Sequence, residues 1–343
     1  MNSSPVTIYL DQLHWIGLAQ AKKGKPVGMP YLPAYRFLTE QAEKGKIFCP
    51  LSLTHYMELA ATGSYRQRTD VATVMTELSG FRTISSTTTL QKAEIRQALN
   101  KYFGKPVAPI KPEPFGFGAF FAGNGEIKVA KLSGDQRAID AFASTIGGSS
   151  KLKEWEHKIT AYMEFNLLRG PHESQVQNLR DKYGYAPEAS EEIGRRRAEQ
   201  EEELAKQLLA DPSQIKNLDN IVMARYLYWE LSGQLTEVLI EVGMTMEDFI
   251  ALGAEGITKF IRDIPTADIL TTFTKANLKT LNRPWKKNDI HDMDALAIAI
   301  PYCDIVVTEK HAYTQLHNAG VEQRYDTVLL KSLEDLPNVL KDL

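Results

Sequence analysis

The chain has 343 residues, of which 43% are hydrophobic and 24% are charged, and its formal net charge is −3. This composition supports a packed core and excludes a largely disordered chain. It also excludes a strongly basic protein that coats nucleic acid. An enzyme that acts on nucleic acid through metal ions stays open, because bound cations supply positive charge locally.

The sequence indicates where the protein resides. Its two cysteines, Cys49 and Cys303, lie in or beside apolar runs, and two buried thiols suit a reducing compartment better than a disulfide framework. The N-terminal MNSSPVTIYLDQ lacks the pattern of a signal peptide. No window approaches the roughly 18 apolar residues of a membrane-spanning helix. We therefore expect a cytoplasmic protein that does not contact a membrane.

The first 103 residues alternate between short apolar runs and helical patterns. Strands are predicted at Val6–Leu10, Lys46–Pro50 and Phe81–Ser85. Helices are predicted at about 13–22, 35–42, 67–78 and 88–103, with a further helix that begins at Ser52 or Thr54 and carries His55 and Glu58. This alternation is typical of a parallel sheet with crossover helices.

The middle of the chain interrupts the alternation. Residues 105–128 are rich in Pro, Gly and Phe and predict an irregular connection. Residues 134–281 are predicted to be almost entirely helical. Within them, residues 188–203 (EASEEIGRRRAEQEEE) are so charged that we expect a solvated helix or a projecting hairpin.

Strand patterns return only near the C-terminus, at Asp304–Thr308 and Thr327–Leu330. The sequence therefore predicts one α/β sheet domain that is made from the two ends of the chain. Its first part spans 1–103 and its second part 285–343, and a mainly helical insertion spans 104–284.

Acidic residues stand where predicted strands end and helices begin. Asp11 follows the first strand, and Glu58 lies one turn into the helix after the second. Asp289 and Asp292 open the helix that leads to the last clear strand, and Glu309 follows that strand. In a parallel sheet these positions gather at one edge. Clustered carboxylates repel each other unless a cation intervenes, and oxygen ligands suit Mg²⁺ or Mn²⁺.

Each of these carboxylates also has a simpler interpretation. Asp289 and Asp292 fit an acidic helix cap, Asp11 a turn, Glu58 an exposed helix position and Glu309 a partner of a neighbouring base. A chance placement of all of these carboxylates at one edge of the sheet is much less expected than a chance placement of any single one.

The motifs TIYLD, SLTHYMELAA and DIVVTE, in this order, resemble those of PIN-domain nucleases, the family that includes the ribonuclease toxins of bacterial toxin–antitoxin pairs. The resemblance covers about residues 5–103 and 285–330. It implies a three-layer α/β/α parallel sheet, which would here be interrupted by a large all-helical insertion.

The resemblance further implies metal-dependent hydrolysis of phosphodiester bonds, most often in RNA, with Mg²⁺ or Mn²⁺ as the cofactor. The implied catalytic residues are Asp11, Glu58 and Asp292, and the implied metal ligands are Asp11, Glu58, Asp289, Asp292 and Glu309. Helical periodicity turns Asp294 about 200° away from Asp292, so one metal centre cannot easily use both. The distance to Val-Val-Thr favours Asp292.

A basic segment precedes these acidic residues. Arg283, Lys286 and Lys287 are predicted to bind the phosphate backbone, with a solvated helix face as the alternative. His55 with Glu58, and His291 with Asp294, have a spacing that zinc ligands also use, but no HExxH or cysteine-rich motif supports zinc.

Two other functions were weighed. A haloacid-dehalogenase-like phosphatase also places an Asp after its first strand, but it needs a second Asp where Leu13 stands. A catalytically inactive PIN-like scaffold would instead bind a partner through its helical insertion. The sequence leaves open an inhibitor or partner protein, a homodimer and the number of metal ions.

Overall fold

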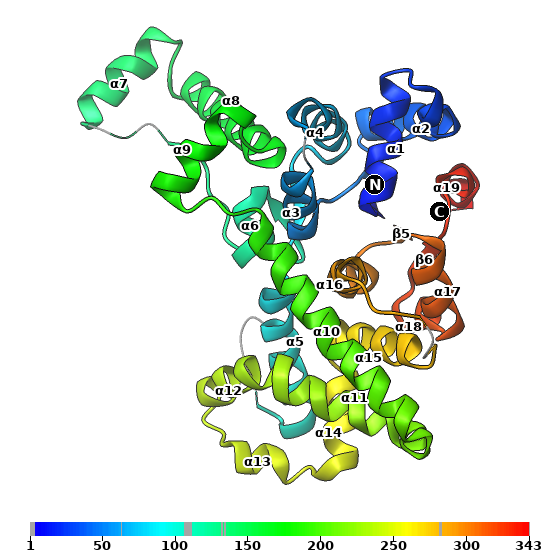
Figure 1. Ribbon diagram of the computed structural model, residues 1–343. Helices are drawn as coiled ribbons and strands as arrows, with labels where there is room; N and C mark the ends of the chain where they lie inside the picture. Colours follow the sequence, from blue (N-terminus) through cyan, green and yellow to red (C-terminus); the bar gives the residue numbers. More distant parts are fainter. Residues whose placement is uncertain are drawn as a thin grey trace.

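The structure, a computed structural model, describes residues 4–62, 64–105, 112–131, 133, 135–280 and 283–342. It is a mixed α/β protein that is mostly helical, with a four-stranded parallel sheet in the order β2-β1-β5-β6 (Figure 1). The strands are β1 (Val6–Leu10), β2 (Ile47–Phe48), β5 (Ile305–Val307) and β6 (Val328–Leu330). Because β1 pairs with both β2 and β5, the two ends of the chain meet in the middle of the sheet. The predicted sheet made from both chain ends is therefore confirmed.

One side chain fixes the register between β1 and β5. The Asp304 carboxylate accepts hydrogen bonds from the backbone N–H and the hydroxyl of Thr7, both at 2.7 Å. The Asp304 N–H donates back to the Thr7 hydroxyl at 2.9 Å. The Asp304 carbonyl also accepts from the Val328 N–H at 2.9 Å. Asp304 thus joins the amino ends of β1, β5 and β6.

The helices of the two chain ends follow the predicted order. The first part contains α1 (Gln12–Lys22), η1 (Pro26–Tyr31), α2 (Leu32–Glu43), α3 (Leu53–Ala61), α4 (Tyr65–Ser79) and α5 (Thr87–Phe103). The second part contains α16 (Lys287–Tyr302), α17 (Lys310–Asn318), α18 (Val321–Tyr325), η4 (Leu333–Asp335) and α19 (Leu336–Asp342). The helices predicted at about 13–22, 35–42, 67–78 and 88–103, the helix that carries Glu58 and the helix before the last clear strand are confirmed, with limits that differ by a few residues, whereas η1, α17, α18, η4 and α19 were not predicted.

The prediction of an all-helical insertion that begins with an irregular connection is wrong. Strand β4 (Phe115–Phe117) pairs antiparallel with β3 (Arg82–Ile84), and helix α6 (Gly118–Asn124) follows at once. Residues 106–111 of the expected connection lie outside the described residues. A parallel bridge from Leu51 to Thr83 places β3 beside the segment that follows β2. The start of the insertion therefore contributes a strand to a separate two-stranded sheet beside the four-stranded one.

Aromatic packing explains why this Pro- and Gly-rich segment is ordered. The Phe115 ring meets Phe48 edge to face at 5.4 Å between centroids, and Phe117 meets Phe81 at 6.0 Å. A Cβ atom at Gly116 would lie 2.4 Å from the Phe121 ring, so only glycine allows this approach. The composition indicated a loop, whereas tertiary contacts of the phenylalanines stabilise a strand.

The rest of the insertion is helical and forms two parts. Helices α7 (Gln136–Thr145), α8 (Ser149–Arg169) and α9 (Glu173–Tyr183) form an arm at the upper left of Figure 1. The long helix α10 (Glu188–Ala210) runs from this arm to a lower lobe. The lobe contains η2 (Pro212–Asn217), α11 (Leu218–Tyr226), η3 (Leu227–Leu231), α12 (Ser232–Glu241), α13 (Met246–Ile250), α14 (Gly253–Arg262) and α15 (Pro265–Leu278).

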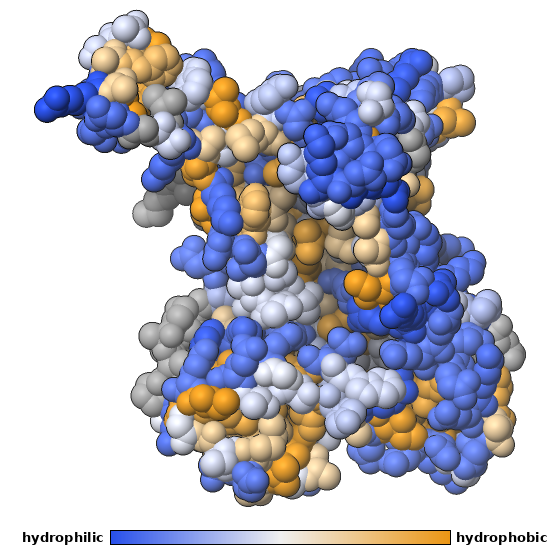
Figure 2. Space-filling view, turned by 60° about the vertical axis from the view of Figure 1, so that its left-hand side comes forward, coloured by the Kyte–Doolittle hydropathy of each residue, from blue (hydrophilic) through white to orange (hydrophobic). Residues whose placement is uncertain are grey.

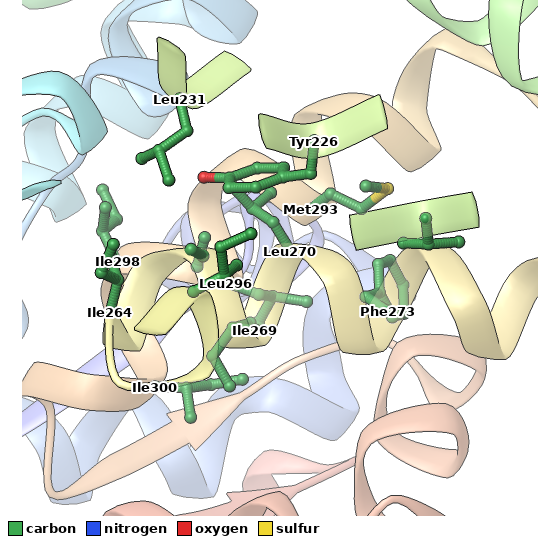
Figure 3. Packing of buried hydrophobic residues seen from close by; sticks show 14 of the residues in the cluster. Tyr226, Leu231, Ile264, Ile269, Leu270, Phe273, Met293, Leu296, Ile298 and Ile300 are labelled. Carbon is green, nitrogen blue, oxygen red and sulfur yellow. The ribbon is translucent and has the colours of Figure 1, made fainter. Parts of the chain in front are cut away.

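The lobe and the sheet domain share one hydrophobic core. Helix α16 contributes Met293, Leu296 and Ile298 to this core, which also contains residues of α11 and α15 (Figure 3). Strand residues such as Val306 belong to the same cluster. Because α16 packs against both the insertion and the sheet, the insertion helps to hold the acidic N-terminal turn of α16 in place.

The expected helix at 188–203 is present, but it is not solvated on all sides. Helix α10 packs along α16, and it buries Gly194, Ala198, Leu204, Ala205 and Leu208. Arg195 and Arg196 lie on the exposed face, where both pair with Glu192 at 2.8 Å, whereas other charges of α10 form ion pairs with α16. Small residues at helical spacing form a narrow buried stripe that the charged composition concealed.

The surface offers no apolar helix suited to a bilayer. No helix in the described part of the chain is long and apolar enough to cross a membrane. Figure 2 shows hydrophobic side chains in several separate groups among polar ones on the visible face.

Candidate functional site

A cavity of about 570 Å³ opens at the carboxyl ends of β1 and β5, between the sheet and helices α3, α10 and α16. The carboxylates that the sequence singled out as catalytic residues or metal ligands all line it. They are Asp11, Glu58, Asp289, Asp292 and Glu309. The structure thus brings together residues from four separate segments of the chain.

Strand ends position Asp11 and Glu309. Each residue follows a strand and stands at the start of the next helix, but neither side chain caps that helix. The Asp11 N–H donates to the Val307 carbonyl at 3.0 Å, which fixes the end of β1 against β5. The Asp11 carboxylate accepts one long hydrogen bond, of 3.3 Å, from the Thr308 hydroxyl. Backbone N–H groups of Gln12 and Glu309 also donate to this carboxylate and lower its pKa, against the larger effect of burial.

A buried histidine positions Glu58. His55 Nδ1 accepts from the Ser52 N–H at 3.0 Å, so Nε2 carries the proton and donates to the Leu10 carbonyl at 2.9 Å. This pair of bonds ties the start of α3 to the end of β1, and Glu58 follows one turn later. Burial lowers the pKa of His55 to about 4. With both ring nitrogens engaged and buried, the zinc interpretation of His55 is wrong.

The two aspartates in the middle of α16 point to different surroundings. Asp292 lines the cavity. Asp294 accepts a hydrogen bond from Arg197 of α10 at 2.6 Å and is not among the residues that line the cavity. The predicted difference in direction between these residues is confirmed, and it follows from the helical periodicity. The ion pair between Asp294 and Arg197 thus links α16 to α10 of the insertion.

Asp289 lines the cavity, but both of its carboxylate oxygens already accept hydrogen bonds. One accepts from Arg283 at 2.6 Å and the other from the Lys286 N–H at 2.8 Å. The side chain is almost fully buried, with 4% of its residue surface exposed. In this arrangement Asp289 is a helix cap and an ion-pair partner, which is the simpler of its two interpretations.

The unpaired carboxyls of the cavity have perturbed acidities. Burial, followed by the charge of Asp11, raises the pKa of Glu58 to about 8, and the charge of Lys287 opposes this shift. Burial also raises the pKa of Asp292, with further contributions from the charges of Asp11, Glu309, Glu58 and Asp289. The pKa of Asp11 is raised by burial as well. The charge of each carboxylate therefore raises the pKa of its neighbours. All of them are ionised together only when positive charge lies nearby.

The three basic residues predicted to bind nucleic acid also line the cavity. Arg283 pairs with Asp289, and Lys287 pairs with Glu191 of α10 at 2.6 Å. Lys286 is exposed and has no ion-pair partner among the residues that the structure describes. The cavity is thus acidic at its floor and carries cationic groups at its rim.

Several residues that line the cavity were not predicted from the sequence, and Gln12, Ser190 and Glu191 are examples. Gln12 lies next to Asp11, and its Oε1 atom is buried without a hydrogen-bond partner in the structure. Ser190 and Glu191 belong to the first turn of α10. Gln12 could have been predicted from the sequence, because it directly follows Asp11 at the end of the first strand. Ser190 and Glu191 gave no local signal, because only the packing of the insertion brings them to the sheet edge.

The cavity does not contain a closed metal cage in this conformation. Across the described ranges, no three His, Cys, Asp or Glu side chains converge closely enough to hold one metal ion. This applies to His291 with Asp294 as well as to the carboxylates of the floor. Comparison of the chain with protein-family models, with curated proteins and with solved structures finds no match.

Proposed function

We propose that the protein is a metal-dependent endonuclease that hydrolyses phosphodiester bonds in RNA, built on a PIN-like domain. The observation that carries this proposal is the set of four carboxylates (Asp11, Glu58, Asp292 and Glu309) that line one cavity from four separate elements. None of these side chains has an ion-pair partner in the described part of the chain, although their neighbours Asp289 and Asp294 do.

The donor set fits a hard divalent cation. It consists of oxygen atoms, which Mg²⁺ and Mn²⁺ prefer over sulfur or imidazole. The buried and unpartnered Oε1 of Gln12 adds a neutral oxygen to the same cavity. Because no three ligands converge as they stand, binding of a cation requires rotation of these side chains toward one another. Relief of carboxylate repulsion favours that rotation.

The acidic and the basic residues of the cavity would have different roles in the reaction. Asp11, Glu58, Asp292 and Glu309 would hold Mg²⁺ or Mn²⁺, which when bound activates water and stabilises the charge that develops on the phosphate. Arg283, Lys286 and Lys287 would hold the phosphate backbone of the RNA at the rim. Asp289 keeps Arg283 oriented toward the cavity through its ion pair.

The alternative is a PIN-like scaffold that binds RNA or a protein without cutting. Glu309 stands where the family more often has Asp, and the longer side chain favours this alternative if it cannot reach the cation. Helix α10 then becomes the functional element, since it forms one wall of the cavity. An inhibitor protein or a second copy of the chain are further candidate partners of that insertion.

One experiment separates the two functions. Purified protein is incubated with single-stranded RNA at increasing Mn²⁺, with and without EDTA, and its melting temperature is recorded in parallel. We expect cleavage that depends on Mn²⁺ and disappears in EDTA. We also expect stabilisation that grows with the cation, by about 2.7 kcal/mol at a hundred times its dissociation constant.

The matched variants are Asp11→Asn and Asp304→Asn, which remove one negative charge at opposite ends of the same sheet. Asp11→Asn should abolish both the cleavage and the Mn²⁺-dependent rise in melting temperature, whereas Asp304→Asn should retain both. Undiminished cleavage in EDTA would disprove the metal-dependent mechanism. Stabilisation by Mn²⁺ without cleavage of any RNA would support the scaffold.

A further inference from the structure

A second cavity adjoins the acidic one on the side of helices α1, α3 and α4. Its volume is about 240 Å³. The two cavities share Ile16 and Thr62 in their linings, so they lie side by side. The remaining lining residues of the second cavity are Ala19, Gln20, Lys25, Leu59, Gln67, Asp70 and Val71.

The floor of this second cavity is apolar and rigid. Ala19, Leu59 and Val71 are buried, with Leu59 completely inaccessible to solvent. They come from three different helices that pack against each other, α1, α3 and α4. Because these three residues expose at most 6% of their surface, the half-buried Ile16 supplies most of the apolar contact that a ligand can make here.

The rim of the same cavity is polar, and few of its side chains are engaged in hydrogen bonds or ion pairs with other described residues. Gln20 and Gln67 stand at the surface, and the structure shows no hydrogen bond from either side-chain amide among the described residues. Asp70 is held by Lys23 at 2.8 Å. Each glutamine amide can both donate and accept hydrogen bonds. The rim can therefore match the mixed donors and acceptors along the edge of a nucleobase.

We propose that this second cavity binds one unpaired base of the RNA, next to the nucleotide whose phosphate lies in the acidic cavity. An apolar surface for the face of a base, with amides at its edge, is how proteins read unpaired bases. The shared wall at Ile16 and Thr62 provides the path between the two cavities. Lys25 at the rim can contact the phosphate of the same nucleotide. This inference rests on the proposed nuclease function.

The proposal defines the substrate class. A cavity of this size accepts a single base and excludes a base pair, so the strand must be unpaired where it enters. The protein should therefore cut single-stranded RNA, with a preference for certain bases at one position beside the cleaved bond.

The test compares cleavage of short single-stranded RNAs that differ at one position at a time, including an abasic residue, in Mn²⁺. For the wild type, we expect one position near the cleaved bond at which kcat/KM depends on the base and falls sharply for the abasic residue. In the double variant Gln20→Ala/Gln67→Ala, the ratio between the preferred base and the abasic residue should fall by about tenfold, the effect of losing hydrogen bonds to the base edge. The matched control Gln177→Ala, on the exposed face of α9, should keep the wild-type ratio.

Three other outcomes are distinct. Equal cleavage of all bases by the wild type, or an unchanged ratio in the double variant, overturns the base pocket and leaves the nuclease function standing. If no RNA is cleaved, the nuclease function fails, and the pocket is then tested by NMR titration with each nucleoside monophosphate. Shifts of the Gln20 and Gln67 side-chain amides support the pocket without catalysis, and their absence with all four compounds overturns it.

Discussion

Acidic residues at the two ends of the parallel sheet differ in burial and in hydrogen bonding. At the amino end, Asp304 is exposed, and its carboxylate accepts two hydrogen bonds of 2.7 Å from Thr7. At the carboxyl end, Asp11 is more enclosed, yet its carboxylate accepts only one side-chain hydrogen bond, of 3.3 Å. Three further carboxylates without ion-pair partners in the described chain line the same cavity.

This difference separates a structural carboxylate from a candidate catalytic one. A third carboxylate, Glu94, shows that burial by itself is not the criterion. It is almost fully buried, and burial raises its pKa, but Thr266 and Tyr302 donate hydrogen bonds to it at 2.6 Å. Glu94 is satisfied by the protein. The carboxylates Asp11, Glu58, Asp292 and Glu309 are partly buried, line one cavity and have no ion-pair partner in the described chain, a combination that favours a site for a positively charged ligand.

The largest expected effect concerns α16, where two aspartates two positions apart have different surroundings. Asp292→Ala should lower the rate of RNA cleavage about a hundredfold or more at saturating Mn²⁺, since it removes a ligand from the cavity. Asp294→Ala should cost much less activity, because Asp294 pairs with Arg197 outside the cavity. Both rates are measured at matched protein concentration. If Asp294→Ala is the inactive variant, the assignment of Asp292 is wrong.

A second prediction concerns the amino end of the sheet. Asp304→Ala should lower the free energy of unfolding by about 1–3 kcal/mol, because it removes two hydrogen bonds to a charged acceptor at the β1–β5 junction. The exposure of Asp304 favours the lower part of that range. Urea denaturation measures the change. If Asp11→Asn lowered the free energy of unfolding by as much as Asp304→Ala, the proposed difference between the two ends of the sheet would be contradicted.

A third prediction concerns the pH dependence of the metal-free protein in EDTA. The pKa of Glu58 is raised to about 8 in the folded state, so between its ordinary acidic pKa and pH 8 the folded protein binds more protons than the unfolded chain. The stability that this group contributes is present at low pH and is lost as the pH rises toward 8, by at most about 1.4 kcal/mol per pH unit for one carboxyl.

The measurement is the melting temperature between pH 5 and pH 8.5 for the wild type and for Glu58→Gln. The variant should show a shallower decline with rising pH. Saturating Mn²⁺ should also reduce the decline in the wild type, because a bound cation favours the ionised carboxylates. A variant that declines as steeply as the wild type would contradict the raised pKa of Glu58.

The smallest expected effect lies at the rim of the acidic cavity. Glu191→Gln releases Lys287 from its ion pair with α10 and removes one negative charge from the path of the RNA. The KM for RNA should fall about two- to threefold, within the modest energy of an exposed pair. The effect should shrink at high salt, where exposed charges are screened. A rise in KM would mean that the ion pair helps to shape the site.

The acidic edge was predictable from the sequence because strand ends are local features. Asp11 and Glu309 follow β-branched runs, and helical periodicity together with the distance to Val-Val-Thr distinguished Asp292 from Asp294. Strand β4 and the burial of α10 were not predictable in this way. The order of Phe115–Phe117 depends on rings from β2 and from the segment before β3. Residues Ser190 and Glu191 reach the cavity only because Gly194 lets α10 approach His291 of α16.

The pairing of Thr7 with Asp304 spans 297 positions of the chain, and this separation has a consequence during translation. At roughly 5–20 residues per second, the ribosome needs about 15–60 s after Thr7 to reach Asp304. Throughout that interval, β1 exposes the edge that β5 will cover; Asp292 is made only near its end, and Glu309 follows after it. For most of its synthesis the nascent chain therefore carries Asp11 and Glu58 without the rest of the acidic cavity, and under the proposed nuclease function it gains activity only when its synthesis is nearly complete.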